Sequence, residues 1–264
     1  MKNSFFAGLL SLTIMISCQP DKQLTNYVNP LLGTATLWET KDLGYERHLK
    51  TRTWGAEVFP GSSVPNAMVQ LSPVTQFRSG AGYQYEDTVI YGFSHTNKGH
   101  WNLLHLPVLP VTGNVSSGDY ASTYSHSNES ARPGYYQVFL ERYGVNAELT
   151  STLRCAYHKY TFRPDDDKKV LVDITRTNNG VRDWSIQKVD DYTFSGNQDA
   201  EGNIRFYAVS NYKIEDIRQF KDGEHEVSVV SFADSKGSKP LELKIGFSFV
   251  SIDNWKQHRN GYFL

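Results

Sequence analysis

The chain has 264 residues, enough for one large β domain or two small ones. Its formal net charge is −1, so it offers no basic field for a phosphate backbone, and we expect no nucleic-acid partner. Its cysteines are Cys18 and Cys155, which excludes a disulfide scaffold. Aromatic residues make up 13% of the chain, and aromatic side chains suit both β-strands and the faces of sugar rings.

The N-terminus has the features of an export signal. Lys2 precedes an apolar run over residues 5–16, which is too short for a membrane-spanning helix. The run ends at Ser17-Cys18, and a small residue before a cysteine resembles a bacterial lipoprotein cleavage box. We therefore expect residues 1–18 to be a lipoprotein signal peptide.

Lipidation of Cys18 would anchor the protein to a membrane, with residues 19–26 as a polar tether. We expect an exported lipoprotein of a Gram-negative bacterium, in the periplasm or on the outer-membrane surface, because both locations share one export route. The alternative is ordinary signal cleavage nearby, with Cys18 incidental.

The segment from residue 24 to residue 113 is rich in Gly, Pro, Trp and Tyr and shows little clean alternation. It predicts long, irregular loops. Loops held by a rigid β scaffold are where binding residues usually lie, so we expect the functional side chains in this segment.

Alternation of apolar and polar residues predicts half-buried strands in the rest of the chain. Every second residue from Leu241 to Phe249 is apolar, and 136–140 with 145–149 predict a hairpin around Tyr143-Gly144. The nearly continuous apolar run 170–174 predicts an inner strand. Further strands are expected at 156–162, 204–209 and 226–232.

Turn signals separate these runs. They stand at Arg163-Pro164-Asp165, Asn179-Gly180, Gly196-Asn197, Glu201-Gly202-Asn203, Asp222-Gly223 and Lys236-Gly237-Ser238. Many short strands with regular breaks, and no sustained helical periodicity, predict an all-β protein: an antiparallel β-sandwich with few short helices.

Several sequence blocks of the mature chain carry a family resemblance. They stand at Tyr27–Thr34, Phe59–Pro73, Gly82–Tyr85, Ile90–Thr96, Arg132–Tyr136, Tyr143–Thr150, His158–Phe162 and Gly246–Ile252. In this order they resemble the N-terminal domain of glycoside hydrolase family 92. Any single block is unspecific, but the series covers nearly all of the mature chain.

The resemblance implies a galactose-mutarotase-like supersandwich over residues 27–252, with a truncated interdomain linker beginning at 253–264. Family members are exo-acting, inverting α-mannosidases that need calcium, and we expect α-1,2 bonds as the substrate. Their calcium ligands, general acid and general base lie on an (α/α)6 barrel, so the resemblance implies no catalytic residue, metal site or bound cofactor in this chain. The implied partners are mannose-containing glycans and that missing barrel.

The loops of the family's sandwich close one side of the mannose pocket. Residues here that offer an aromatic wall or hydrogen-bond donors are Trp54, Phe59, Phe77, Arg78, His95, Asn97, Lys98, His100 and Trp101. Phe77 stands where the family often has a Trp that faces the sugar, and residues 97–102 depart from the family's usual His and small residues. These departures leave the linkage specificity open, and core packing is the alternative for each aromatic residue.

The residues themselves give little sign of catalysis. Inverting hydrolysis needs two carboxyl groups about 6.5–9.5 Å apart. Neighbours on a strand point to opposite faces, so the adjacent pairs are not ready-made; they are Glu86-Asp87, Asp190-Asp191 and Glu215-Asp216. The evenly spaced His95, His100 and His105 lack a cysteine or close carboxylate to complete a metal site, which favours structural histidines or sugar donors.

Three interpretations follow. In the first, the chain is the sandwich half of an α-mannosidase and recognises sugar only together with its barrel. In the second, it is a free-standing surface glycan-binding lipoprotein. In the third, it is an immunoglobulin-like adhesion domain, which the loops that resemble a sugar site argue against.

Overall fold

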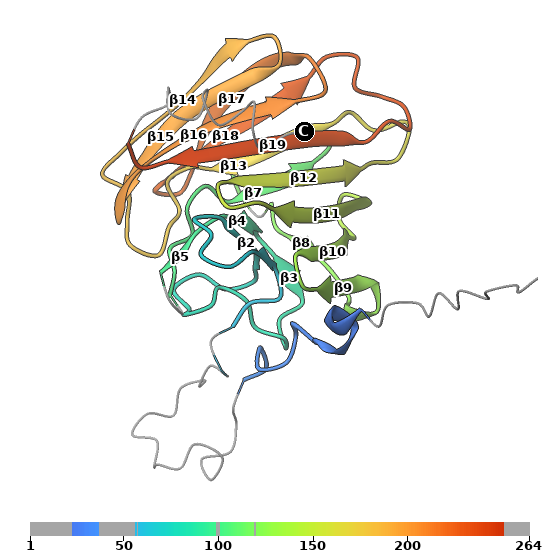
Figure 1. Cartoon of the computed structure of the whole chain (residues 1–264). Helices are drawn as coiled ribbons and strands as arrows, with labels where there is room; N and C mark the ends of the chain where they lie inside the picture. The colour runs from blue at the N-terminus through green and yellow to red at the C-terminus, as the bar shows by residue number, and fades with distance from the viewer. Residues whose placement is uncertain (1–22, 37–55, 57, 99–100, 119, 251–264) are drawn as a thin grey trace, which may run out of the picture.

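The computed structural model describes residues 23–36, 56, 58–98, 101–118 and 120–250. The expected signal peptide, Cys18 and the expected linker from residue 253 lie outside these residues. Two antiparallel sheets dominate the fold, and the described helices are the short 3-10 turns η1 (Leu24–Tyr27) and η3 (His126–Asn128). No helix within these ranges is long and apolar enough to cross a membrane. The predicted all-β sandwich is confirmed (Figure 1).

The larger sheet has eight strands. In spatial order they are β14 (Asp183–Asp190), β15 (Thr193–Ala200), β16 (Gly202–Ser210), β19 (Leu241–Ser248), β12 (Cys155–Thr161), β11 (Val145–Ser151), β10 (Tyr135–Leu140) and β9 (Glu129–Arg132). The predicted hairpin is confirmed, because β10 and β11 pair from Leu140 with Val145 to Tyr135 with Thr150.

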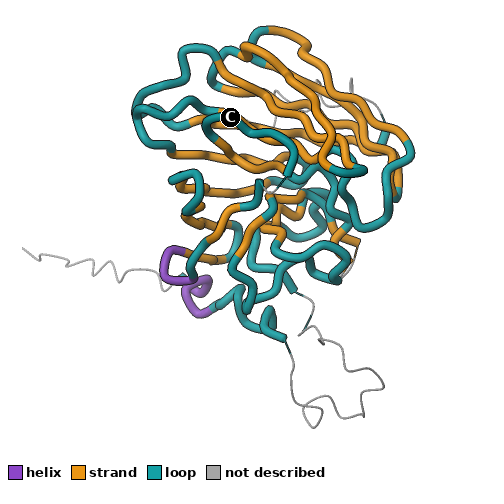
Figure 2. The backbone as a smooth tube through the Cα atoms, turned by 180° about the vertical axis from the view of Figure 1, so that it is seen from behind, coloured by secondary structure: helices purple, strands orange, loops and turns teal. Residues whose placement is uncertain are grey.

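The second sheet has seven strands. They are β1 (Ser62–Ser63), β2 (Gln70–Val74), β4 (Gly92–Ser94), β7 (Val108–Val111), β13 (Lys169–Asp173), β18 (His225–Phe232) and β17 (Ile214–Asp222). Two small pairs complete the described strands: β3 (Val89–Ile90) with β8 (Ser122–Thr123), and β5 (Asn97–Lys98) with β6 (Trp101–Asn102). Seen from behind, the strands form layers with the helical turns at one lower edge (Figure 2).

The core lies between the two sheets. Phe93 on β4 packs its ring 6.5 Å from that of Tyr136 on β10 and 6.4 Å from that of Tyr160 on β12, so it joins the two layers. The predicted inner strand is confirmed, since β13 lies between β7 and β18 and buries every residue from Val170 to Asp173. Burial of these side chains supplies the main stabilisation.

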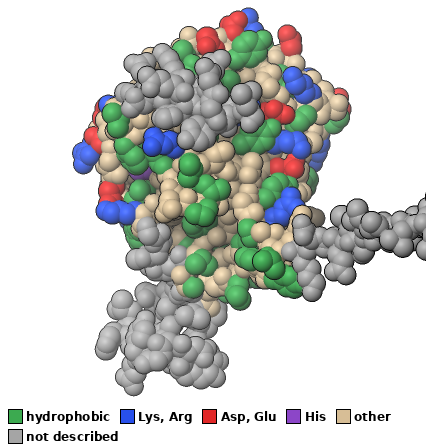
Figure 3. Space-filling view, in the orientation of Figure 1, with side chains coloured by type: hydrophobic (Ala, Val, Ile, Leu, Met, Phe, Trp, Pro, Cys, Tyr) green, Lys and Arg blue, Asp and Glu red, His purple; other side chains and the backbone are tan. Residues whose placement is uncertain are grey.

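The alternation on β19 holds from Leu241 to Phe247, and its apolar residues Leu241, Leu243, Ile245 and Phe247 are buried. Phe249 was expected on the same face, but it lies beyond the end of the strand and is 48% exposed. Exposed apolar side chains also lie on the N-terminal segment 23–36, at Leu24, Tyr27, Val28 and Leu32. Figure 3 shows apolar side chains gathered at this lower edge of the molecule.

Two expectations about the strands are wrong. The supposed turn at Gly196-Asn197 lies within β15, where a Cβ on Gly196 would stand 1.9 Å from the carbonyl oxygen of Ser185. Glycine is needed there for a close approach between strands, and not for a turn. The segment before residue 113, expected as loops, also supplies β2, β4 and β7 to the seven-stranded sheet.

Candidate functional site

Four chain segments meet at one rim of the sandwich, which we call the rim: residues 76–82, the β5–β6 hairpin at 97–102, residues 176–182, and the turn between β15 and β16. The side chain of Asn178 ties the first two together. Its Oδ1 accepts a hydrogen bond from the amide of Arg78 (2.7 Å). Its Nδ2 donates to the carbonyl oxygens of Ser79 (3.2 Å) and Asn102 (2.6 Å).

A charged contact joins β5 to the turn between β15 and β16. The Nζ atom of Lys98 lies 2.6 Å from Oε1 of Glu201, in the turn between β15 and β16. The Nδ2 atom of Asn179 donates to the other oxygen of the same carboxylate at 2.8 Å. Glu201 thus joins β5 to the segment 176–182 through its two carboxylate oxygens.

Asn102 fixes the base of the hairpin. Its Oδ1 accepts from the backbone amide of Leu104 at 2.8 Å, and its Nδ2 donates to the carbonyl oxygen of Ala81 at 3.3 Å. A Cβ on Gly82, whose φ is +76°, would stand 2.3 Å from this Nδ2 atom. The Gly82 of the Gly-Tyr block is therefore required both for its backbone conformation and for space.

Phe77 and Arg78 lie side by side on the rim but differ in exposure. Phe77 is half-buried, with the guanidinium of Arg176 5.1 Å from its ring centroid and the ring of Tyr91 4.9 Å away. Arg78 is exposed and has a φ of 56°, a left-handed conformation that is uncommon for a residue with a side chain. The hydrogen bond that its backbone amide donates to Oδ1 of Asn178 supports that conformation.

The imidazole of His95 lies in the core and not on the rim. It is fully buried, with its Nε2 3.0 Å from Nε2 of His158, whose Nδ1 lies 2.7 Å from the hydroxyl of Tyr160. Burial lowers the pKa of His95 to about 3 and holds the pKa of His158 well below its usual range. His105 is also buried, beside the hydroxyl of Thr96. These are structural histidines, the alternative considered above.

The other predicted contacts fall into two groups. Asn97, Trp101 and Phe59 are half-buried, and both polar side-chain atoms of Asn97 are buried without a hydrogen-bond partner. Trp54 and His100 lie outside the described residues. The structure therefore brings Phe77, Arg78, Asn97, Lys98 and Trp101 to the rim, on the segments 76–82 and 97–102.

Members of two of the three adjacent carboxylate pairs make local contacts. Glu86 accepts a hydrogen bond from the backbone amide of Thr36 at 2.9 Å, and Asp87 accepts one from the hydroxyl of Thr75 at 2.8 Å. The Nζ of Lys213, 3.0 Å from Asp191, lowers the pKa of that carboxyl. Over the described ranges, no three His, Cys, Asp or Glu side chains gather in a way that could hold a metal ion.

Sequence reasoning missed two anchoring groups. Asn178 stands beside the Asn179-Gly180 turn signal, which marked a loop but not its partners. Glu129 is a fully buried carboxylate that accepts hydrogen bonds from Tyr83 (2.9 Å) and Tyr136 (2.6 Å) and lies 2.5 Å from Nδ1 of His126. Burial, with this carboxylate beside them, raises the pKa of both tyrosines. Its spacing in the sequence gives no sign of this cluster.

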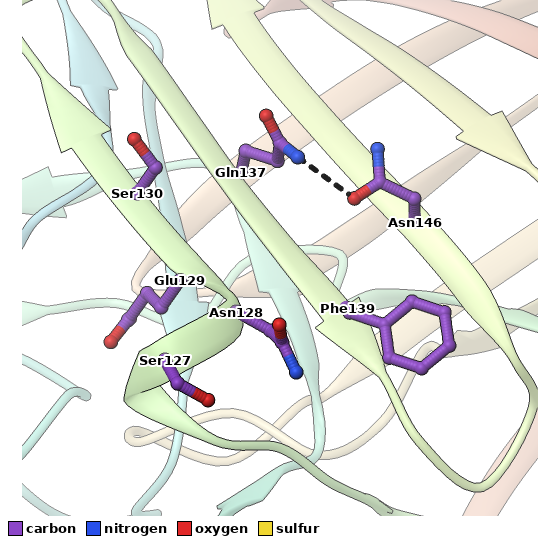
Figure 4. A pocket seen from close by; sticks show the side chains of 7 residues that line it. All are labelled: Ser127, Asn128, Glu129, Ser130, Gln137, Phe139 and Asn146. Carbon is purple, nitrogen blue, oxygen red and sulfur yellow. Dashed lines mark hydrogen bonds between the residues drawn. The ribbon is translucent and has the colours of Figure 1, made fainter.

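Cavities open on the described part of the chain, and no predicted sugar contact lines the following three. One of about 540 Å³ lies on β9–β11 (Figure 4), one of about 690 Å³ lies between the N-terminal segment and the β9–β10 turn, and one of about 280 Å³ lies on β14–β16.

Comparison with known protein families and solved structures identifies relatives of this chain. The model of the family described as "Glycosyl hydrolase family 92 N-terminal domain" matches residues 27–248 of this chain. Curated protein sequences give no match. A solved family GH92 alpha-mannosidase from Bacteroides thetaiotaomicron is 28% identical with a TM-score of 0.74, over 90% of this chain and 34% of that one. Its complex with mannoimidazole is 27% identical with a TM-score of 0.73, over the same shares.

A family GH92 inverting mannosidase from Bacteroides thetaiotaomicron VPI-5482 shares the fold, with 21% identity and a TM-score of 0.72 over 89% of this chain and 33% of that one. The chain thus spans about a third of the length of these solved relatives. Because the family model covers most of the chain, this protein belongs to glycosyl hydrolase family 92 and corresponds to that family's N-terminal domain.

Proposed function

We propose that this domain supplies the sugar-facing rim of a family 92 α-mannosidase, which removes terminal α-mannosyl residues, by preference α-1,2-linked, from glycans. The observation that carries the proposal is the bracing of two rim segments by Asn178, which sets a row of aromatic and hydrogen-bonding side chains on a fixed backbone. The solved relative that holds mannoimidazole supports a mannose-like ligand.

The rim offers the chemistry that sugar binding needs. Lys98 and Arg78 are exposed cationic donors, and Trp101 is a half-buried aromatic side chain on the same hairpin as Lys98. The side-chain amide of Asn97 is buried without a hydrogen-bond partner, which is costly for a polar group. A braced site loses little conformational entropy on binding, which favours affinity for a small ligand.

We propose that the catalytic carboxyl groups and the calcium ion belong to the two thirds of the relatives that this chain does not span. The described residues offer no set of His, Cys, Asp or Glu side chains that would hold a calcium ion. The role proposed for this chain is to orient the sugar and to exclude water from one side of it.

The assay of this proposal uses the chain alone with 4-nitrophenyl α-D-mannopyranoside. We expect no release of nitrophenol above the uncatalysed rate, because we propose that the general acid and general base belong to the part of the relatives that this chain does not span. Measurable turnover that disappears with purified Glu86→Gln or Asp87→Asn variants would overturn the proposal, since the chain would then hold its own catalytic carboxyl group.

A free-standing surface glycan-binding lipoprotein is the second candidate, favoured by the Ser17-Cys18 cleavage box. It predicts saturable binding of α-1,2-mannobiose with a Kd on the order of 1 mM or tighter in calorimetry. It also predicts a lipid on Cys18 by mass spectrometry, and loss of membrane association in Cys18→Ala. The absence of saturable binding at this affinity would exclude the free-standing candidate.

A further inference from the structure

A groove on the outer face of the eight-stranded sheet lies away from the rim. Its cavity volume is about 540 Å³, and its lining is Ser127, Asn128, Glu129, Ser130, Gln137, Phe139 and Asn146. Figure 1 draws β9 and β10 on the opposite side of the molecule from β5, so the groove and the rim are separate places.

The groove is built by strand register. On β10, Gln137 and Phe139 alternate with buried neighbours and so face outward. Phe139 stands opposite Asn146 on β11, and Gln137 stands opposite Ser130 on β9. Figure 4 shows these side chains rising from neighbouring strands around one hollow, with the ring of Phe139 at its edge.

The polar side chains of the groove are ordered and still have hydrogen bonds to give. Nε2 of Gln137 donates to Oδ1 of Asn146 at 3.0 Å, which fixes both amides and leaves both N–H groups of Asn146 Nδ2 free to donate. Within the described part of the chain, the side chains of Asn128 and Ser130 make no hydrogen bond, and both residues are exposed.

The groove carries no free charge. Its one ionisable lining residue is Glu129, which stands opposite the buried Val138 and turns its carboxylate to Tyr83, Tyr136 and His126 in the core. A phosphate or a metal ion would therefore find no counter-charge. Neutral amides and hydroxyls beside an aromatic ring match the hydroxyl groups and apolar faces of a sugar.

We propose that this groove is a second carbohydrate-binding site, for an uncharged oligosaccharide, independent of the rim. Asn146 and Asn128 donate to sugar hydroxyls, and Phe139 packs against a ring face. In an exo-acting enzyme such a site would hold a branched glycan while its tip is processed elsewhere, although the binding itself does not depend on the function proposed for the rim.

Side-chain amide resonances of the full chain test this proposal. Methyl α-D-mannopyranoside, maltotriose and cellotriose are titrated to tens of millimolar, with D-glucuronate as the charged comparison. We expect saturable shifts of the side-chain amides of Asn128, Gln137 and Asn146 with at least one neutral probe, and smaller shifts with D-glucuronate.

The variant Asn146→Ala removes two free donors and frees the Gln137 amide, so we expect roughly tenfold weaker binding at the groove. Asn197→Ala, an asparagine on the outer face of β15 in the same sheet, is the matched control and should leave that binding unchanged. The proposal would be overturned if the groove amides did not shift with any neutral probe or shifted more with D-glucuronate. It would also be overturned if Asn146→Ala bound the sugar as tightly as the unmodified chain. Rim resonances report the other site separately, so the two proposals fail independently.

Discussion

The two parts of this chain reach the same sandwich by different means. From β10 onward, long strands alternate buried and exposed residues, and apolar packing positions them. Before β8, short strands are joined by loops whose shape depends on individual polar side chains, such as Asn102 and the later Asn178. The difference indicates that stability resides mainly in the regular part and the proposed recognition surface in the irregular one.

The largest expected effect is a cavity in the regular part. Leu243 is fully buried on the central strand β19, and Leu243→Ala should lower the free energy of unfolding by about 2–5 kcal/mol in denaturant titration. Leu153→Ala, at a side chain 39% exposed, is the control and should stay within about 0.5 kcal/mol. Equal effects would contradict the assignment of stability to the packed strands.

Removing the side chain of Asn178 should destabilise the rim before the rest of the fold. Asn178→Ala breaks three hydrogen bonds to the backbone, and we expect a loss of about 1–3 kcal/mol together with faster hydrogen exchange at the Arg78 amide. Asn179→Ala removes only the contact with Glu201 and is the matched control. A rim whose exchange is unchanged in Asn178→Ala would show that the loops are held by something else.

Lowering the pH should reduce the free energy of unfolding because the buried histidines resist protonation in the folded state. The unfolded chain binds a proton at His95 below a pKa near 6.5, whereas the buried ring resists protonation down to about 3. The unfolded state therefore binds more protons in this window, and stability falls as the pH drops from about 6.5 to 3, by at most about 1.4 kcal/mol per pH unit for each such histidine. His95→Gln should flatten the slope of stability against pH; an unchanged slope would contradict a neutral buried ring.

The smallest effect is expected at the exposed ion pair of the rim. The side chains of Lys98 and Glu201 are 72% and 41% exposed, so Lys98→Ala should change stability by no more than about 1 kcal/mol, and less in high salt. A larger loss in thermal unfolding would mean that this contact, and not Asn178, holds the hairpin.

Much of the fold could be predicted because the alternation of apolar and polar residues along a strand shows which of its residues are buried. The hairpin β10–β11 and the strands β12, β13 and β19 bury the faces that the sequence indicates. Strands β14 and β17 escaped prediction because most of their residues are exposed and polar, which removes the apolar signal. Gly196 was misinterpreted because a close strand contact and a turn both require glycine.

The site was predictable only in part. Selecting aromatic and hydrogen-bonding side chains from the loop segment led to Phe77, Lys98 and Trp101 on the rim, but also to His95, which packs in the core against His158. A histidine that donates to a sugar and one that pairs with another histidine have the same sequence signature. Asn178 lies about a hundred residues from the loop it braces, and no local pattern encodes such a contact.

A titration of the chain with α-1,2-mannobiose, followed by backbone amide shifts, tests the central claim most directly. The rim proposal predicts saturable shifts of the amides of residues 76–82, 97–98 and 101–102 at high sugar concentration, and their loss in Trp101→Ala. No response of these amides, with the folded spectrum otherwise intact, would contradict a sugar-facing rim.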